Sequence, residues 1–143
     1  MKKDFWSNAE IAVVGGGSWG TVLANLASQN CAHVKIWVRE EEQAREINAT
    51  RLNPKYFPNL VLSEKVKAYS QLDRIFESEL HCIIWALPSN VTREIGVEVA
   101  KRLRGDELII HATKGVEPRT LKRISVVLEE ENCSAHGYWR GKY

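Results

Sequence analysis

The residues best suited to chemistry are three glycines with a fixed spacing, Gly15, Gly17 and Gly20, in the segment GGGSWG. They follow a β-branched apolar run, EIAVVG (10–15), and open a segment whose apolar residues have helical spacing. In such a strand–turn–helix unit the first glycine permits a tight turn, the second leaves room for a pyrophosphate, and the third lets the helix pack against the strand. The free N–H groups at the start of that helix would face the phosphates. The spacing therefore predicts a dinucleotide site rather than an empty structural turn.

The nature of the dinucleotide depends on the end of the next predicted strand, about 20 residues beyond the glycines. An acidic side chain there binds the ribose 2′-hydroxyl of NAD, whereas an arginine accommodates the 2′-phosphate of NADP or stacks on the adenine. This chain has Arg39 at that position, followed by Glu40, Glu41 and Glu42. Arg39 favours NADP over NAD, while Glu40 keeps NAD open. The plainer alternative is an arginine that only ends an exposed strand.

Length and composition exclude several classes of protein. The chain has 143 residues, of which 44% are apolar and 27% charged, with a net charge of +2. This length fits one domain, the apolar fraction argues against disorder, and the near-balanced charge lacks the basic footprint of nucleic-acid binding. The longest strongly apolar stretch (82–88) is far shorter than the ~20 residues that cross a bilayer, and the start MKKDFWSNAE lacks the apolar region of a signal peptide. We therefore expect a cytoplasmic protein with no membrane span and no nucleic-acid partner.

The spacing of cysteine and histidine indicates no metal site. Cys31, Cys82 and Cys133 are far apart and form no CxxC pair. The four histidines have neither HExxH spacing nor cysteine partners at ligand spacing. We expect small buried thiols in a reducing compartment, and no metal.

The rest of the chain alternates between strand-like and helix-like patterns. Short β-branched apolar runs predict strands at 10–15, 33–38, 66–69, 82–87 and 107–112. Amphipathic spacing predicts helices at 18–30, 40–50 and 71–78, then one that Ser89 caps and that ends near Gly105. It predicts a last helix with Pro118 as its first residue and Leu121, Ile124 and Leu128 facing inward. Two prolines predict a loop at 52–62.

Five strand–helix units in succession predict an α/β fold. Right-handed crossovers place helices on both faces of a parallel sheet. The near-continuous apolar run CIIWAL (82–87) fits a strand that is buried on both faces. With the glycine loop after the first strand, the expected architecture is a Rossmann-type doubly wound parallel sheet in a single domain.

Four separated motifs resemble one enzyme family. They are GGGSWGT (15–21), NPKYFPNLVL (53–62), WALPS (85–89) and ATKGVEPRTLKRIS (112–125). In this order they resemble the N-terminal nucleotide-binding domain of the NAD(P)-dependent glycerol-3-phosphate dehydrogenase family, over residues 9–131. Gly16, where alanine is common, and Trp85, where a smaller apolar residue is usual, depart from the family pattern.

The resemblance implies an oxidoreductase that transfers hydride between NAD(P)H and glycerone phosphate to give sn-glycerol 3-phosphate, which feeds glycerophospholipid synthesis. It implies a small-molecule phosphate substrate, with NADP or NAD as cofactor. The cofactor-binding residues that it implies are Gly15, Gly17, Ser18, Trp19, Gly20, Arg39, Tyr56, Pro88, Val91 and Lys114. Lys114 would also contact the substrate, and it follows the fifth predicted strand at the end where open α/β sheets bind ligands. An ammonium group there would neutralise a substrate phosphate or stabilise the charge that develops on a carbonyl oxygen.

The family carries a second, helical domain that supplies the main acid–base lysine, and this sequence does not contain it. We therefore expect a nucleotide-binding domain at 1–131, truncated before the helical C-terminal domain, and an atypical tail at 132–143. Such a fragment would bind cofactor without turnover, and its exposed sheet edge leaves room for a homo-oligomer. Two alternatives stay open: a stand-alone dinucleotide-binding module without catalysis, and a sugar or hydroxyacid dehydrogenase that shares the nucleotide-binding half. The aromatic and basic residues at 139–143 also occur on stacking surfaces for nucleic acid, although we favour a loosely docked terminus.

Overall fold

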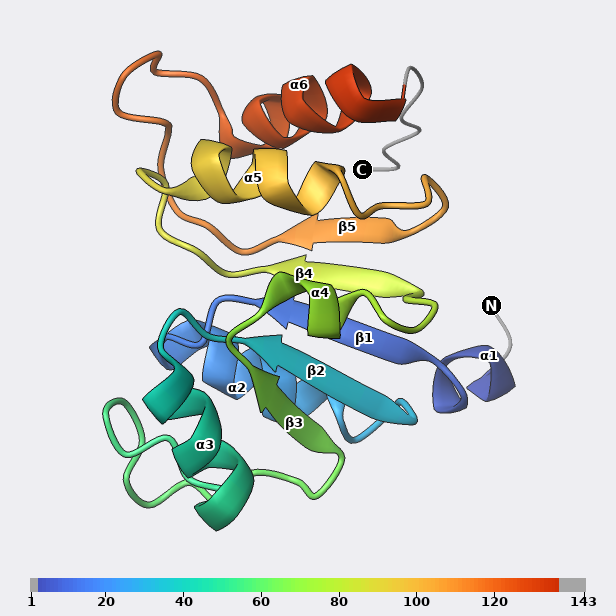
Figure 1. Ribbon diagram of the computed structural model, residues 1–143, viewed down its shortest axis with the longest axis vertical. Coiled ribbons are helices and arrows are strands. Elements are labelled where there is room, and N and C mark those ends of the chain that lie inside the picture. Colours follow the sequence, from blue (N-terminus) through green and yellow to red (C-terminus); the bar gives the residue numbers. More distant parts are fainter. Residues whose placement is uncertain (1–2, 137–143) are drawn as a thin grey trace.

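Five parallel strands form the sheet of the computed structural model, which describes residues 3–136 and the side chains within 5–132. The strands are β1 (Glu10–Val14), β2 (His33–Trp37), β3 (Val66–Tyr69), β4 (Cys82–Trp85) and β5 (Leu108–His111). Their spatial order is β3-β2-β1-β4-β5, and all five arrows point the same way in Figure 1. The chain winds outward from β1 to β3 and then returns to place β4 on the other side of β1. This topology confirms the predicted doubly wound sheet.

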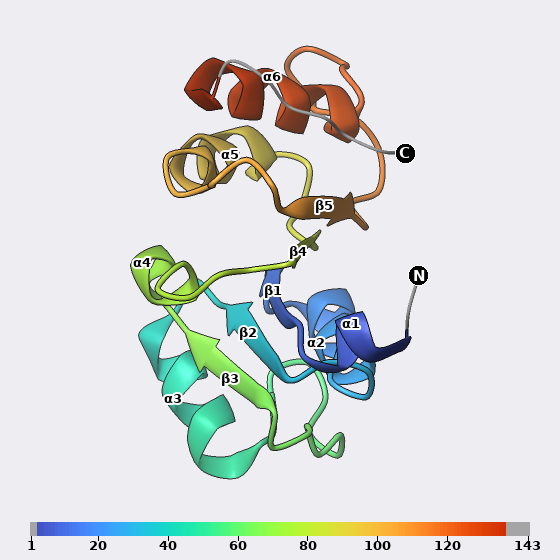
Figure 2. The same cartoon turned by 90° about the vertical axis from the view of Figure 1, so that its right-hand side faces the viewer.

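Helices cover both faces of the sheet. Within the described residues they are α1 (Lys3–Ser7), α2 (Ser18–Ala27), α3 (Glu41–Thr50), α4 (Leu72–Ile75), α5 (Thr92–Ala100) and α6 (Ile124–His136). Figure 2 shows α2 on one side of the sheet and α4 and α5 on the other. Strand β1 separates two core clusters, because Ile11 and Val13 pack with α2 and α3 whereas Ala12 and Val14 pack with α4, α5 and α6.

The predicted start of the helix after β4 is wrong. Helix α5 begins at Thr92 with Val91 as its N-cap residue, so Ser89 lies before the helix and does not cap it. The reason lies in Thr92, whose hydroxyl donates to the carbonyl oxygen of Pro88 (3.0 Å) and accepts from Nε1 of Trp85 (3.1 Å). The buried indole of Trp85 therefore has a polar partner, and this partner fixes where the helix starts.

The predicted start of the last helix is also wrong. Pro118 and Leu121 lie in a loop, and α6 begins only at Ile124. An antiparallel bridge between Val116 and Arg123 folds the segment between them back on itself. Leu121 has a φ of +58° and is 74% exposed, so it does not face inward. Ile124 and Leu128 are buried, as predicted.

Other boundaries differ by a few residues. The helix predicted at 71–78 is a single turn at Leu72–Ile75, and the one predicted to end near Gly105 ends at Ala100. The strand predicted at 107–112 spans Leu108–His111, and the carboxylate of Glu107 just before it accepts bonds from the N–H groups of Arg104 and Gly105. Sequence patterns missed the short helix α1. The loop at 52–62 has neither helix nor strand, as predicted.

Residues 132–136 of the predicted tail continue helix α6. The predictions for the aromatic and basic residues 139–143 lie outside the described residues. Cys31 and Cys82 are buried, and burial raises the pKa of the Cys82 thiol to about 11. None of the described helices is long and apolar enough to span a membrane.

Three glycines let the loop after β1 pack against its neighbours. A Cβ at Gly20 would lie 1.8 Å from the carbonyl oxygen of Gly15, so α2 crosses the strand end at a distance that only glycine permits. Gly15 has a φ of +121°, and its missing Cβ would lie 2.6 Å from the carbonyl oxygen of Ala86. A Cβ at Gly16 would lie 2.2 Å from Cγ1 of the buried Val38, so this valine fills the space that an alanine would need.

A charged cluster joins α5, α6 and the loop between β5 and α6. Arg93 donates to both carboxylate oxygens of Glu117 (2.7 and 2.8 Å), to Glu131 (2.5 Å) and to Glu130 (3.0 Å). Glu117 also accepts from the hydroxyl of Thr120. The hydrogen bonds from Arg93, and then that from Thr120, lower the pKa of the Glu117 carboxyl to about 2. Arg93 therefore ties the loop after β5 to the two helices.

The close approach of Gly16 to Val38 predicts that Val38→Ala partly restores the stability lost in Gly16→Ala. Gly16→Ala alone should destabilise the fold by about 1–3 kcal/mol, because the added methyl overpacks a buried site. Val38→Ala alone should cost about 1–3 kcal/mol through the lost methyl groups. The double variant should be more stable than the sum of these losses by about 1 kcal/mol or more, as measured by urea unfolding of all four proteins. Strictly additive losses would show that the two positions do not compete for space.

The Arg93 cluster predicts a specific loss of stability in acid. Because folding lowers the pKa of Glu117, its contribution is complete above its ordinary pKa of 4.5 and disappears as the pH falls towards 2. The melting temperature of Glu117→Gln should therefore lie furthest below that of the wild type near neutral pH and approach it in acid. Glu79→Gln is the control, since that exposed carboxylate pairs only at the surface with Arg104 (3.3 Å) and its loss should change little. A difference in melting temperature between Glu117→Gln and the wild type that does not vary with pH would contradict this account.

Candidate nucleotide-binding site

A cavity of about 1000 Å³ lies at the carboxyl ends of the strands. Its walls come from the loop after β1, the end of β2, the 52–62 loop, the loop after β4 and the loop after β5. Strands β1 and β4 are neighbours there, but the connection after β1 leads to β2 on one side of the pair and the connection after β4 leads to β5 on the other. Open α/β sheets bind their ligands at such a switch point.

The cavity brings together residues that are far apart in the sequence. The predicted cofactor residues on its wall are Gly15, Gly17, Ser18, Trp19, Arg39, Tyr56, Pro88, Val91 and Lys114. Gly20 is the exception: it is buried and does not line the cavity. Its part is to let α2 approach β1, which places the start of that helix at the cavity.

The start of α2 is suited to bind an anion. Gly17 is the N-cap residue, with an extended backbone (φ −76°, ψ −168°), and a Cβ there would meet nothing within 4 Å. No described residue accepts a hydrogen bond from the backbone N–H groups of Gly17 or Ser18. The ten-residue helix adds the positive end of its dipole. A phosphate would therefore find free donors and no steric obstacle at this point.

A buried polar network lies behind the glycine loop, and sequence patterns did not reveal it. Nδ2 of Asn53 donates to the carbonyl oxygen of Gly16 (3.1 Å) and to the hydroxyl of Thr21 (2.8 Å). Nε2 of Gln43 donates to the same carbonyl oxygen (2.8 Å) and to Oδ1 of Asn53 (3.2 Å). The Thr21 hydroxyl donates to the carbonyl oxygen of Gly17 (2.7 Å). In the sequence Asn53 is the first residue of the motif NPKYFPNLVL (53–62), and no role was predicted for it.

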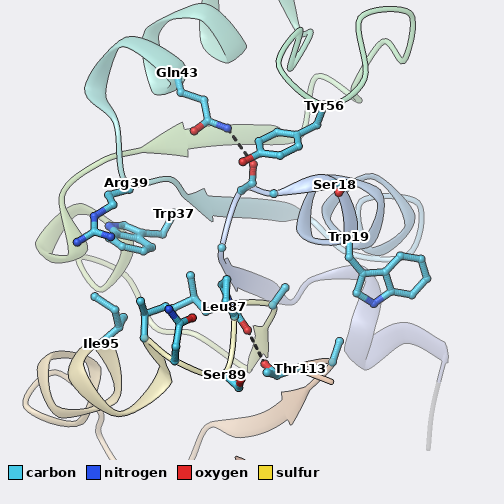
Figure 3. Close-up of a pocket in the computed structure, with 18 of the residues that line it drawn as sticks. Ser18, Trp19, Trp37, Arg39, Gln43, Tyr56, Leu87, Ser89, Ile95 and Thr113 are labelled. Atoms are coloured by element: carbon cyan, nitrogen blue, oxygen red, sulfur yellow. Dashed lines mark hydrogen bonds between the residues drawn. The ribbon is translucent and has the colours of Figure 1, made fainter. Parts of the chain in front are cut away.

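One side of the cavity carries the residues predicted to bind adenosine. Arg39 is exposed, and it has no ion pair with any described residue. Figure 3 shows Arg39 and Trp37 on one side of the glycine loop and Trp19 on the other. Glu40 also lines the cavity, next to Arg39. The 52–62 loop adds Lys55, whose Nζ lies 5.7 Å from the centre of the Tyr56 ring.

The opposite side is built from the ends of β4 and β5. The hydroxyl of Thr113 donates to the carbonyl oxygen of Leu87 (2.8 Å), which joins the two loops (Figure 3). Lys114 follows as an exposed lysine on the cavity wall. Gly115, with a φ of +85°, then turns the chain away. Pro88 and Val91 face the same space from the loop before α5.

Charged side chains of both signs line the cavity, with more cations than anions. Arg39, Lys55 and Lys114 are cationic, and Glu40 and Glu94 are anionic. Among the described residues, no group of three His, Cys, Asp or Glu side chains lies close enough together to hold a metal ion.

Comparison with known proteins identifies the family. A family model described as the N-terminus of NAD-dependent glycerol-3-phosphate dehydrogenase matches residues 10–138. The glycerol-3-phosphate dehydrogenase [NAD(P)+] of Lactococcus lactis subsp. cremoris is 45% identical over 122 residues, which are 85% of this chain. The enzyme of the same name from Streptococcus thermophilus is 42% identical over 122 residues, again 85% of this chain.

A solved structure agrees with these relatives. Glycerol-3-phosphate dehydrogenase from Coxiella burnetii superposes with a TM-score of 0.80 and 28% identity, and the match covers 87% of this chain and 38% of that one. The chain spans 35% of the Lactococcus relative and 36% of the Streptococcus relative. The matched part is thus about the first third of a longer enzyme in those proteins, and it contains the glycine loop and the cavity described above. On this evidence, the chain belongs to the family defined by the N-terminal domain of NAD-dependent glycerol-3-phosphate dehydrogenases.

Proposed function

We propose that this chain is the dinucleotide-binding part of an oxidoreductase that interconverts glycerone phosphate and sn-glycerol 3-phosphate. The observation that carries the proposal is the free start of α2, where Gly17 leaves open space at the switch point of the sheet. The names of the relatives support NAD or NADP as the dinucleotide. A cytoplasmic location and a homo-oligomer stay predictions.

The residues present fit an extended dinucleotide. The amides of Gly17 and Ser18 would bind the pyrophosphate, Arg39 the adenosine end, and Pro88 and Val91 the nicotinamide end. Tyr56 and Lys55 would close the cavity from the 52–62 loop. When bound, the nicotinamide supplies or accepts the hydride. The part of this chain is to hold that ring beside the end of β5.

Lys114 is the residue that we propose to contact both cofactor and substrate. It lies on the cavity wall at the carboxyl end of β5, in the loop that Thr113 joins to Leu87 and that Arg93 holds through Glu117. A cation fixed at this point would bind the substrate phosphate or stabilise negative charge on the carbonyl oxygen of glycerone phosphate. Proton delivery to that oxygen would also need a positioned acid.

Titration with NADPH or NADH tests the proposal directly. We expect saturable quenching of tryptophan fluorescence, since Trp19 lies on the cavity wall, with a dissociation constant between micromolar and millimolar, or about −8 to −4 kcal/mol. Gly17→Val should abolish the signal because its side chain would occupy the space for the pyrophosphate. The same change should alter the free energy of unfolding by less than about 1 kcal/mol, because a Cβ there meets no neighbour. A folded Gly17→Val that binds like the wild type would show that this loop does not hold phosphate.

The position of Arg39 on the cavity wall predicts that the chain prefers NADPH to NADH. Arg39→Ala should weaken NADPH about tenfold or more, the equivalent of ~1.4 kcal/mol, and weaken NADH much less. Arg45→Ala is the matched control, because Arg45 is an exposed arginine that pairs with Glu41 (2.7 Å) and does not line the cavity. Isothermal titration of both cofactors into the three proteins measures the effect. Equal losses for NADPH and NADH would mean that Arg39 does not contact the 2′-phosphate.

A further inference from the structure

We propose that Asn53 is the positioning residue that directs the N–H group of Gly17 into the cavity, and so prepares the loop for a pyrophosphate. The inference rests on the proposed function, because it concerns how that same site is held ready. It adds a residue that does not itself touch the ligand. Asn53 is fully buried and does not line the cavity.

The geometry of one peptide group sets the direction of the Gly17 N–H. The peptide between Gly16 and Gly17 is trans, because the described chain has no cis bond. In a planar trans peptide the C=O and N–H groups point in opposite directions. The Gly16 carbonyl is directed into the protein by bonds from Nδ2 of Asn53 (3.1 Å) and Nε2 of Gln43 (2.8 Å). The Gly17 N–H therefore points the other way, away from Asn53 and Gln43, and no described residue accepts a hydrogen bond from it.

Asn53 is suited to this task because both N–H groups and the oxygen of its side-chain amide have hydrogen-bond partners. One N–H bonds to the Gly16 carbonyl and the other to the Thr21 hydroxyl, while Oδ1 accepts from Gln43. A buried amide with these partners has one favourable orientation, since any rotation leaves a polar group unsatisfied. Glycines have no side chain to restrain them, so without such an anchor the Gly16–Gly17 peptide can rotate.

The backbone of Asn53 joins this anchor to a second wall of the cavity. Its carbonyl oxygen accepts from the N–H groups of Tyr56 (3.0 Å) and Phe57 (2.7 Å). Asn53 thus binds the glycine loop through its side chain and the turn that carries Tyr56 through its backbone. The two walls are held in one arrangement by a residue behind them.

Asn48 on α3 serves as a control, although it is an exposed asparagine whereas Asn53 is buried. Its side chain also makes two bonds to distant backbone, donating to the carbonyl oxygen of Ala68 (2.8 Å) and accepting from the Ala68 N–H (2.8 Å). Asn48 does not line the cavity and does not contact the glycine loop. Loss of its amide should cost stability but leave the Gly17 N–H where it is.

The test compares Asn53→Leu and Asn53→Asp with Asn48→Leu and Asn48→Asp. NADPH affinity is measured by isothermal titration, each protein at the same interval below its own melting temperature. We expect both Asn53 variants to lose at least tenfold in affinity and both Asn48 variants to stay within twofold. The Gly17 amide resonance in the ¹⁵N–¹H spectrum of the ligand-free protein should move in the Asn53 variants alone, and should no longer respond to added inorganic pyrophosphate.

The outcomes distinguish a failure of the proposed function from a failure of the proposed role of Asn53. Wild-type protein that binds no NADPH overturns the proposed function, and this inference with it. Wild-type binding with unchanged affinity in the Asn53 variants overturns the inference alone, as does an equal loss in the Asn48 variants. A loss in Asn53→Asp without one in Asn53→Leu would show repulsion by the new charge instead of positioning. If neither Asn53 variant folds, Thr21→Val decides: it removes one partner of the Asn53 amide, while the Gly17 carbonyl loses the hydroxyl but keeps its bond from the Thr21 N–H (3.0 Å). A loss of at least threefold supports the inference, and unchanged affinity overturns it.

Discussion

Helix α2 crosses the end of strand β1 so closely that a Cβ at Gly20 would lie 1.8 Å from the carbonyl oxygen of Gly15. This contact decides where the helix begins, and therefore where its free N–H groups lie. Because β1 is next to β4, the same point is the switch point of the sheet. The position of the cavity, its open centre at Gly17 and its suitability for an anion all depend on this one approach of helix to strand.

The two sides of the cavity are held by different kinds of interaction. Behind the glycine loop, neutral amides and a hydroxyl form a buried network in which Asn53 has a partner for both of its N–H groups. On the side of Lys114, the loop after β5 is held by the charged pair of Arg93 and Glu117 and by the bond from Thr113 to Leu87. A neutral network suits the side that we propose to bind phosphates, because a buried carboxylate there would repel them.

The charged pair also makes the two sides differ in their response to pH. Folding lowers the pKa of Glu117, so the stability that its ionised carboxylate contributes is lost as the pH falls towards 2. The amide network behind Gly16 has no group that titrates in this range. Acid should therefore affect the Lys114 side of the cavity before the glycine loop.

Local sequence patterns by themselves determined the alternation of strands and helices, the parallel sheet, the glycine loop with Arg39 after the second strand, and the resemblance to the family that the comparisons confirm. These features depend on spacing within a few residues, which a single sequence displays. Only the folded structure decided the starts of α5 and α6, because Thr92 bonds to the buried Trp85 and Val116 pairs with Arg123 before the last helix. The same holds for Asn53, whose partner Gly16 lies 37 residues away in sequence. A contact over that distance leaves no local pattern, since it exists only once the sheet brings the two loops together.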